Sequence, residues 1–312
     1  MKITAIQFAE LAARLMLDSS VHSFTAARLC RRQGEHQRAA IWYRRALRLG
    51  RLADNQIDIA NARLGMGNLE SDLGNMAKAE VHFWKAARAA LRNGRRSLAA
   101  AAFHNLIGVA YDTGRTADAF EHLQKAARCY DPEHPRFPAF AYDAGFFLMR
   151  EGYFSSALLV FETVLPRVDG QRVSILVRSA LARSAAAVRD NIRYTRQSAA
   201  VLAMVAVDDE DSANALYQLA EGARSFQDWE RSQALAHRAL SLATKRSDSR
   251  IARYATGLLD AIERREPGDV DRVPPEDDPI DSVTQDVLRK LKKKGAPTRE
   301  GGAVTPERYP TE

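Results

Sequence analysis

Residues 33–47 read QGEHQRAAIWYRRAL, and three later segments align with them without gaps. These are LGNMAKAEVHFWKAA from Leu73, TGRTADAFEHLQKAA from Thr113 and EGYFSSALLVFETVL from Glu151. In every segment a glycine, a small residue, a large apolar residue and a second small residue recur at the same positions. Four columns that agree at one spacing indicate an internal repeat, the sequence pattern of a solenoid.

Each column has a mechanical interpretation. A glycine between two helices accepts positive φ and lets the first helix end without steric cost. The small residue that follows lets the second helix approach the first, and the large residue four positions later fills the gap on the same face. The last small residue leaves space for the first helix of the next repeat to pack closely. The columns are Gly34, Gly74, Gly114 and Gly152; Ala39, Ala79, Ala119 and Ala157; Tyr43, Phe83, Leu123 and Phe161; and Ala46, Ala86, Ala126 and Val164.

The pattern G-x-x-x-x-A-x-x-x-[YFL]-x-x-A resembles the second half of a tetratricopeptide repeat (TPR). RLGMGNLESDLG and FHNLIGVAYDTG look like first helices of that family, although Phe103 stands where the family usually has Trp. Glycines 40 residues apart resemble the longer-helix branch found in kinesin light chain and in bacterial regulator-binding solenoids. The resemblance implies an all-α fold, a right-handed α–α superhelix, and the composition after it predicts a disordered C-terminal tail.

The repeats predict the domain organisation. We expect an N-terminal capping helix in residues 1–19, about six helix pairs and a closing helix in residues 20–265, and a disordered tail in residues 266–312. The fifth pair, at about residues 174–207, is degenerate, and Asp190 is read as the replacement for its glycine. The composition, rich in Ala, Leu and Arg, favours helices.

Two stretches interrupt the repeat. DPEHPRFP, from Asp131, contains three prolines, which predict either a stiff elbow or an ordinary loop. EPGDVDRVPPEDDP, from Glu266, is acidic and rich in proline, a composition typical of disorder. The next residues, near 280–294, predict a short basic amphipathic helix, which could fold on a partner, on a membrane surface or back onto the solenoid, or have no role.

Charge and cysteine content limit the partners and the compartment. The net charge is +7, and because residues 266–312 hold 11 acidic and 8 basic residues, the rest of the chain carries +10. A basic body favours acidic partners. The sequence predicts a protein partner rather than nucleic acid, since no aromatic-basic interleaving occurs. Two distant cysteines, a charged N-terminus and no apolar run long enough to span a bilayer predict a cytoplasmic protein without a transmembrane segment.

Catalytic and cofactor motifs are missing from the sequence. There is no P-loop, dinucleotide glycine fingerprint, H-E-x-x-H or C-x-x-C motif. His82 and His122 share one repeat column, but Trp42 holds that column in the first repeat, so packing or solvent exposure explains them better than a metal site. We therefore expect no cofactor, no metal and no enzymatic activity.

In tetratricopeptide solenoids the first helix of each pair lines an inner groove that binds peptides. Carried over by register, this resemblance predicts groove residues in several repeats. Asn105 matches the inward Asn that clamps a peptide backbone in this family, since an amide both donates and accepts. Arginines in the first repeat would favour an acidic peptide or a terminal carboxylate. The predicted groove residues are Arg28, Arg31, Arg32, Asn61, Asn68, His104, Asn105, Tyr111, Tyr142, Phe146, Tyr217 and Gln218.

The sequence thus predicts a scaffold or adaptor that binds a peptide or protein partner in the groove, and the arginines of the first repeat favour an acidic one. One variant is self-regulation, in which the acidic segment PEDDPID of the tail occupies the arginine-rich groove. Two alternatives remain: nucleic-acid binding by the basic body, and a phosphatase-like activity like that of some bacterial relatives of this fold. The fold itself does not choose between them.

Overall fold

In this computed structural model the described residues are 4–16, 19–205, 211–272 and 279–293. Within those ranges the chain forms α-helices and one 3-10 turn, and no β-strand. The all-α prediction is confirmed. The chain divides into two compact units between His134 and Pro135, inside the predicted proline-rich interruption.

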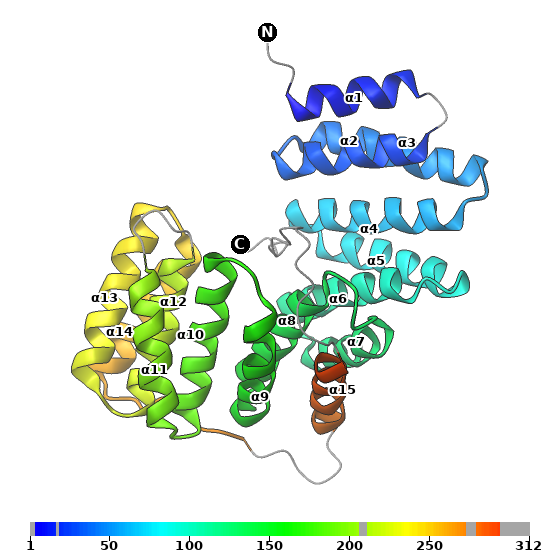
Figure 1. Ribbon diagram of the computed structural model, residues 1–312. Helices are drawn as coiled ribbons and strands as arrows, with labels where there is room; N and C mark the ends of the chain where they lie inside the picture. Colours follow the sequence, from blue (N-terminus) through cyan, green and yellow to red (C-terminus); the bar gives the residue numbers. More distant parts are fainter. Residues whose placement is uncertain (1–3, 17–18, 206–210, 273–278, 294–312) are drawn as a thin grey trace. The chain divides into compact units, whose positions relative to one another are not determined.

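Unit 1 consists of a single helix followed by three helix pairs (Figure 1). Each pair has a first and a second helix, and each helix packs on the next along the chain. The helices are α1 (Ala5–Leu15), α2 (Ser20–Arg32), α3 (His36–Leu52), α4 (Gln56–Asp72), α5 (Met76–Arg92), α6 (Arg96–Asp112) and α7 (Thr116–Cys129).

Unit 2 repeats the arrangement with α8 and α9, α10 and α11, and α12 and α13, followed by the closing helix α14 and the tail helix α15. The first helices are again neighbours, because α10 packs on α12 and α12 packs on α14. The helices are α8 (Phe137–Arg150), α9 (Phe154–Val164), α10 (Gln171–Ala187), α11 (Asn191–Met204), α12 (Ser212–Ser225), α13 (Trp229–Lys245), α14 (Ser249–Glu263) and α15 (Pro279–Lys293).

The four repeat columns have the predicted roles. All four glycines adopt positive φ, between 73° and 88°. The small and large residues of the other three columns are buried, with exposures of 1% or less. The rings also need space on neighbouring helices: a Cβ on Gly67 of α4 would lie 2.5 Å from a ring carbon of Phe83, and one on Gly145 of α8 would lie 2.8 Å from a ring carbon of Phe161. Glycine on the neighbouring helix therefore leaves the space that the large residue of the repeat fills.

In the fifth repeat the prediction for the turn is wrong by one residue. Arg189, with φ 65°, holds the left-handed position, whereas Asp190 follows it as the N-cap of α11 and accepts from the amide of Arg193. The Arg189 side chain also donates to the carbonyl oxygen of Ser225 at the end of α12. This hydrogen bond connects the fifth repeat to the sixth.

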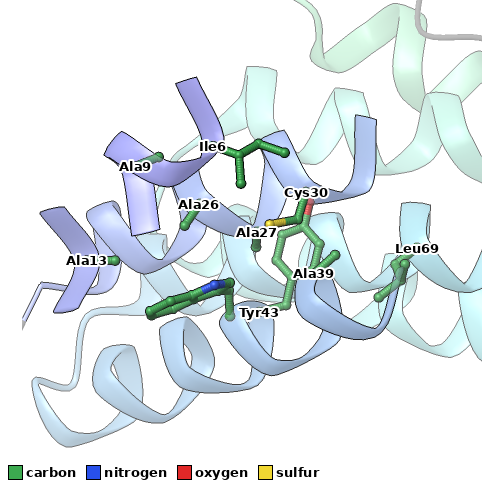
Figure 2. Close-up of a cluster of buried hydrophobic side chains, with 10 residues drawn as sticks. Ile6, Ala9, Ala13, Ala26, Ala27, Cys30, Ala39, Tyr43 and Leu69 are labelled. Carbon is green, nitrogen blue, oxygen red and sulfur yellow. The ribbon is translucent and has the colours of Figure 1, made fainter. Parts of the chain in front are cut away.

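The capping helix α1 contributes Ile6, Ala9 and Ala13 to the apolar cluster in Figure 2, and its buried Glu10 forms hydrogen bonds with the helices below it. Glu10 accepts hydrogen bonds from Arg38 Nη2 at 2.5 Å and from the Trp42 indole at 2.8 Å. Burial alone would raise the pKa of Glu10, but the hydrogen bonds from Arg38 and Trp42 and the Arg38 charge outweigh it and lower the pKa. Burial, followed by the nearby Glu10 charge, raises the pKa of the Cys30 thiol to about 11.

The structure differs from the expected tail at its beginning. Residues 266–272 lie in extended conformation against unit 2 instead of leaving the fold at Glu266. The predicted amphipathic helix is α15, and it packs on α9 and α8 of the same unit. Its apolar stripe, which includes Val283, Val287 and Leu291, is buried. Of the alternatives for this helix, folding back onto the solenoid matches the structure. Most of the segment PEDDPID, residues 275–281, lies outside the described residues.

Candidate peptide-binding faces

In unit 1 the predicted residues lie on the first helices α2, α4 and α6. Arg28 and Arg32 are exposed on α2. Arg31 instead forms an ion pair at 2.7 Å with Asp72 at the end of α4, and its side chain is 10% exposed. The arginine cluster is therefore split: two members face solvent, and the third connects neighbouring repeats.

The two predicted asparagines of adjacent repeats meet. Asn105 Nδ2 on α6 donates to Asn68 Oδ1 on α4 at 2.6 Å, and both side chains are half-buried. One amide hydrogen bond thus joins the first helices of the second and third repeats. Each amide retains further donor or acceptor capacity, which suits it to contact a peptide backbone.

The remaining predicted residues of unit 1 are half-buried. Asn61 lies two turns before Asn68 on α4, and Tyr111 lies near the end of α6. The His104 ring makes an edge contact with Tyr130, with ring centroids 6.3 Å apart. His104 is therefore partly committed to packing inside unit 1.

In unit 2, Tyr142 and Phe146 on α8 form an aromatic pair with centroids 6.1 Å apart, and Tyr142 also contacts Phe161 of α9. Burial, followed by the negative charge of Asp143, raises the pKa of Tyr142. The contacts with Phe146 and Phe161 make Tyr142 a packing residue of the α8–α9 pair more than an exposed contact for a ligand.

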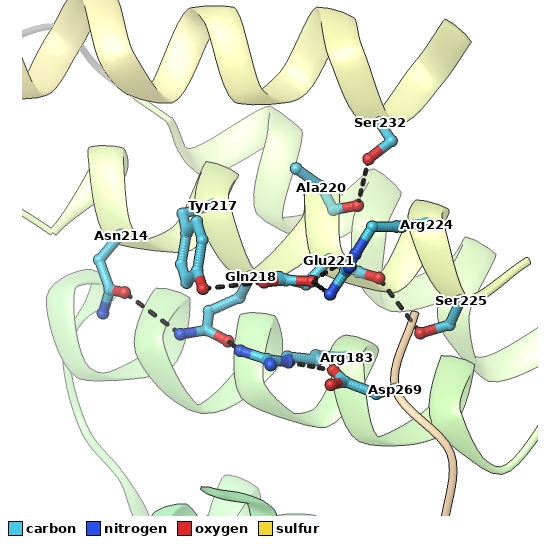
Figure 3. Close-up of polar contacts among 10 residues, drawn as sticks. All are labelled: Arg183, Asn214, Tyr217, Gln218, Ala220, Glu221, Arg224, Ser225, Ser232 and Asp269. Atoms are coloured by element: carbon cyan, nitrogen blue, oxygen red, sulfur yellow. Dashed lines mark hydrogen bonds and ion pairs between the residues drawn. The ribbon is translucent and has the colours of Figure 1, made fainter. Parts of the chain in front are cut away.

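One face of α12 carries a polar network (Figure 3). Tyr217 donates to Glu221 at 2.8 Å, and the same carboxylate accepts from Arg224 at 2.7 Å. Gln218 is buried, donates to Asn214 and accepts from Arg183 Nη1 of α10 at 3.0 Å. Burial, followed by the nearby Glu221 charge, raises the pKa of Tyr217. The predicted pair Tyr217 and Gln218 therefore belongs to a polar site shared by two repeats.

Arg183 is the centre of that site, although sequence reasoning missed it. Its Nε forms an ion pair with Asp269 of the tail at 2.6 Å, and the two side chains are 16% and 18% exposed. The guanidinium also lies 5.9 Å from the centre of the Tyr217 ring. Burial alone would lower the pKa of Arg183, but the carboxylates of Asp269 and Glu221 outweigh it and raise the pKa.

The rest of the extended segment makes contacts on both sides of this ion pair. A Cβ on Gly268 would lie 2.6 Å from the Ser225 Cα and 2.8 Å from the carbonyl carbon of Arg224, so only glycine fits beside α12. Further along, Asp271 accepts from the Ser155 amide at 2.9 Å at the N-terminus of α9, and from the Ser155 hydroxyl. The Arg272 amide donates to the Gly152 carbonyl at 2.8 Å.

Among the residues that the structure describes, no three His, Cys, Asp or Glu side chains gather as a metal site would require. In the same parts of the chain, no helix is long and apolar enough to cross a membrane.

Comparisons with known proteins show similarity at the level of the fold. No family model and no curated protein sequence matches this chain. Among solved structures, BtubC (BKLC) from P. vanneervenii aligns with a TM-score of 0.56 at 15% identity, over 64% of this chain and 91% of that protein. YrrB, described as a TPR protein with an unusual peptide-binding site, aligns with a TM-score of 0.40 at 19% identity, over 81% of this chain and all of YrrB. The TPR domain of P58(IPK) aligns with a TM-score of 0.31 at 14% identity, over 84% of this chain and 92% of that domain. The repeat columns and the helix pairs together define a protein with a TPR-like helical repeat fold.

Proposed function

We propose that this chain is a non-enzymatic scaffold that holds an extended peptide of a protein partner on the faces of its first helices. The observation that carries the proposal is in unit 2, where the faces of α10 and α12 hold an extended segment of the chain itself. That segment is bound through an ion pair with Arg183, a glycine contact with α12, and hydrogen bonds with Gly152 and Ser155 at the start of α9. A foreign peptide can make contacts of the same kinds.

Unit 1 offers a comparable face. Asn68 and Asn105 place two linked amides on adjacent first helices, and the exposed Arg28 and Arg32 add positive charge at the α2 end. Amides that donate and accept suit a peptide backbone, and guanidinium groups bind carboxylates in a bidentate manner. We therefore propose that the partner peptide is acidic at the end that lies over α2.

Charge reversal on α2 tests this proposal. The variant Arg28→Glu/Arg32→Glu should lose most of its partner in a crosslinking capture from native extract treated with nuclease. Arg31 is left unchanged, because its reversal would place a carboxylate beside Asp72 and disturb the packing of α2 on α4.

The matched control is Arg44→Glu/Arg48→Glu on the second helix α3, where both arginines are also exposed. It makes the same change in net charge on the other helix of the same repeat. The proposal requires that this control keeps the partner. Equal capture by both variants would show that the α2 face does not bind it, and capture that disappears with nuclease would indicate nucleic-acid binding instead.

A further inference from the structure

The segment of residues 266–272 occupies unit 2 as a ligand occupies a site. Its Asp269 reaches the half-buried Arg183, its Gly268 passes against the α12 backbone, and its Asp271 caps α9. The segment itself contributes little to the core, since Val270, its one aliphatic side chain beyond proline, is 66% exposed. Polar recognition, more than apolar burial, holds it in place.

The receiving site is built from the solenoid's own residues. Gln218 accepts from the Arg183 guanidinium, the Tyr217 ring lies beside it, and both side chains belong to α12. Tyr217 and Arg224 are in turn held by Glu221. Because these contacts do not involve the tail, Arg183 stays oriented when Asp269 leaves. A fixed guanidinium in a partly dehydrated site attracts a carboxylate strongly.

We propose that the face of α10 and α12 around Arg183 is a binding site for an extended acidic peptide of the form Gly-Asp-x-Asp, and that residues 266–272 are its resident occupant, which a partner peptide must displace. The inference rests on the proposed scaffold function and names the class of peptide for unit 2. Gly268 meets the α12 backbone, Asp269 the Arg183 guanidinium and Asp271 the α9 amide, so each acidic or glycine position of the motif has its own contact.

Residues 266–272 compete with a free peptide for the site, because they are covalently attached next to it. A segment tethered next to its site acts at an effective concentration in the millimolar range for short linkers, so it weakens every free peptide that uses the same site. If the resident segment fills the site nine-tenths of the time, releasing it strengthens binding of a free peptide about tenfold.

The probe is a fluorescein-labelled peptide with the sequence of residues 264–273, RREPGDVDRV, titrated into the full chain by fluorescence anisotropy. In the chain, Gly268→Val releases the resident segment, because its side chain would strike backbone atoms of α12 that cannot move aside. This substitution leaves Arg183 and its partners on α12 untouched. We expect the Gly268→Val chain to bind the probe at least about ten times more tightly than the wild type.

Two controls test the chemistry of the site. A probe with Asn in place of both aspartates should lose binding to Gly268→Val, because the amide carries no charge for Arg183. Gly268→Val combined with Arg183→Gln should also lose binding of the original probe, and its thermal unfolding midpoint shows whether it is folded.

Equal probe affinity for wild type and Gly268→Val, no binding to either, or unchanged binding of the Asn probe would overturn the proposal. In each of those cases residues 266–272 are only a structural part of unit 2 and do not occupy a peptide-binding site. The result is independent of the α2 test of the scaffold function, because the probe comes from this chain and binds unit 2.

Discussion

The buried side chain of His122 is expected to make the protein less stable at acidic pH. The side chain is buried on α7, and its ring makes an edge contact with Trp84 of α5, with centroids 5.3 Å apart. Burial, followed by the charge of Lys125, lowers the pKa of His122. Burial, followed by the charge of Arg63, likewise lowers the pKa of His82, the matching residue of the preceding repeat. Of the two alternatives left open for this column, packing and solvent exposure, packing matches the structure at His122.

The lowered pKa of His122 gives a prediction about stability and pH. The unfolded chain takes up a proton at the ordinary histidine pKa of about 6.5, whereas the folded chain resists until lower pH. Stability from neutral His122 is therefore present above about pH 6.5 and lost as the pH falls below it. The urea midpoint should fall between pH 7.5 and 5.5, and His122→Leu should reduce that fall. The exposed His237→Leu is the control and should leave it unchanged; a fall unaltered by His122→Leu would contradict the account.

Among the residues of the polar network in unit 2, some could be predicted from the sequence and Arg183 could not. Tyr217 and Gln218 could be predicted because their repeat keeps its columns, and both lie in the polar network of unit 2. Arg183 could not, because its repeat is degenerate and gives no register for α10. Its partner Asp269 lies in a segment whose composition predicted disorder. α10 also contains Arg172 and Arg178, so the sequence does not single out Arg183 among its arginines.

The helices and the turns between them were the features that the sequence predicted best. Glycine at a fixed spacing decides where the first helix ends in the first four repeats, because the turn requires positive φ, and this held at Gly34, Gly74, Gly114 and Gly152. Arg189 and Gln227 hold the same left-handed position after α10 and α12, so the fifth and sixth repeats make this turn without glycine. Helices themselves follow from local sequence, whereas a turn without glycine leaves no such local pattern.

Two glycine substitutions separate helix propensity from packing between elements. Gly67→Ala in α4 should destabilise the protein by about 1–3 kcal/mol, because its Cβ would enter the space of the buried Phe83 ring. Gly257→Ala in α14 should stabilise it by about 0.5–1 kcal/mol, because no described atom beyond the neighbouring turn of α14 itself lies within 4 Å of the new Cβ and alanine favours helix. Urea unfolding of both variants measures the difference. A Gly67→Ala protein as stable as wild type would mean that α4 does not need close contact with α5.

For the whole molecule, composition predicted where the repeats are interrupted, at the proline-rich stretch from Asp131. It did not predict that residues 266–272 bind to unit 2. The chain divides between His134 and Pro135, within the stretch whose prolines forbid a continuous helix. Residues 266–272 have the acidic, proline-containing composition of a disordered segment, yet Asp269 and Asp271 each find a partner on unit 2. Composition reports how little a segment can bury, and it contains no information about a site elsewhere in the chain that matches it.

The central claim is that the first-helix faces bind the partner, and site-specific photocrosslinking tests it most directly. A photoreactive amino acid would replace Asn61 on the first helix α4 in one protein and the exposed Lys85 on the second helix α5 in another. Both positions lie in the same repeat, so differences in stability or concentration are small. The account predicts a crosslinked partner peptide from position 61 and none from position 85. Crosslinks from position 85 with none from position 61 would place the partner on the second-helix face and contradict the account.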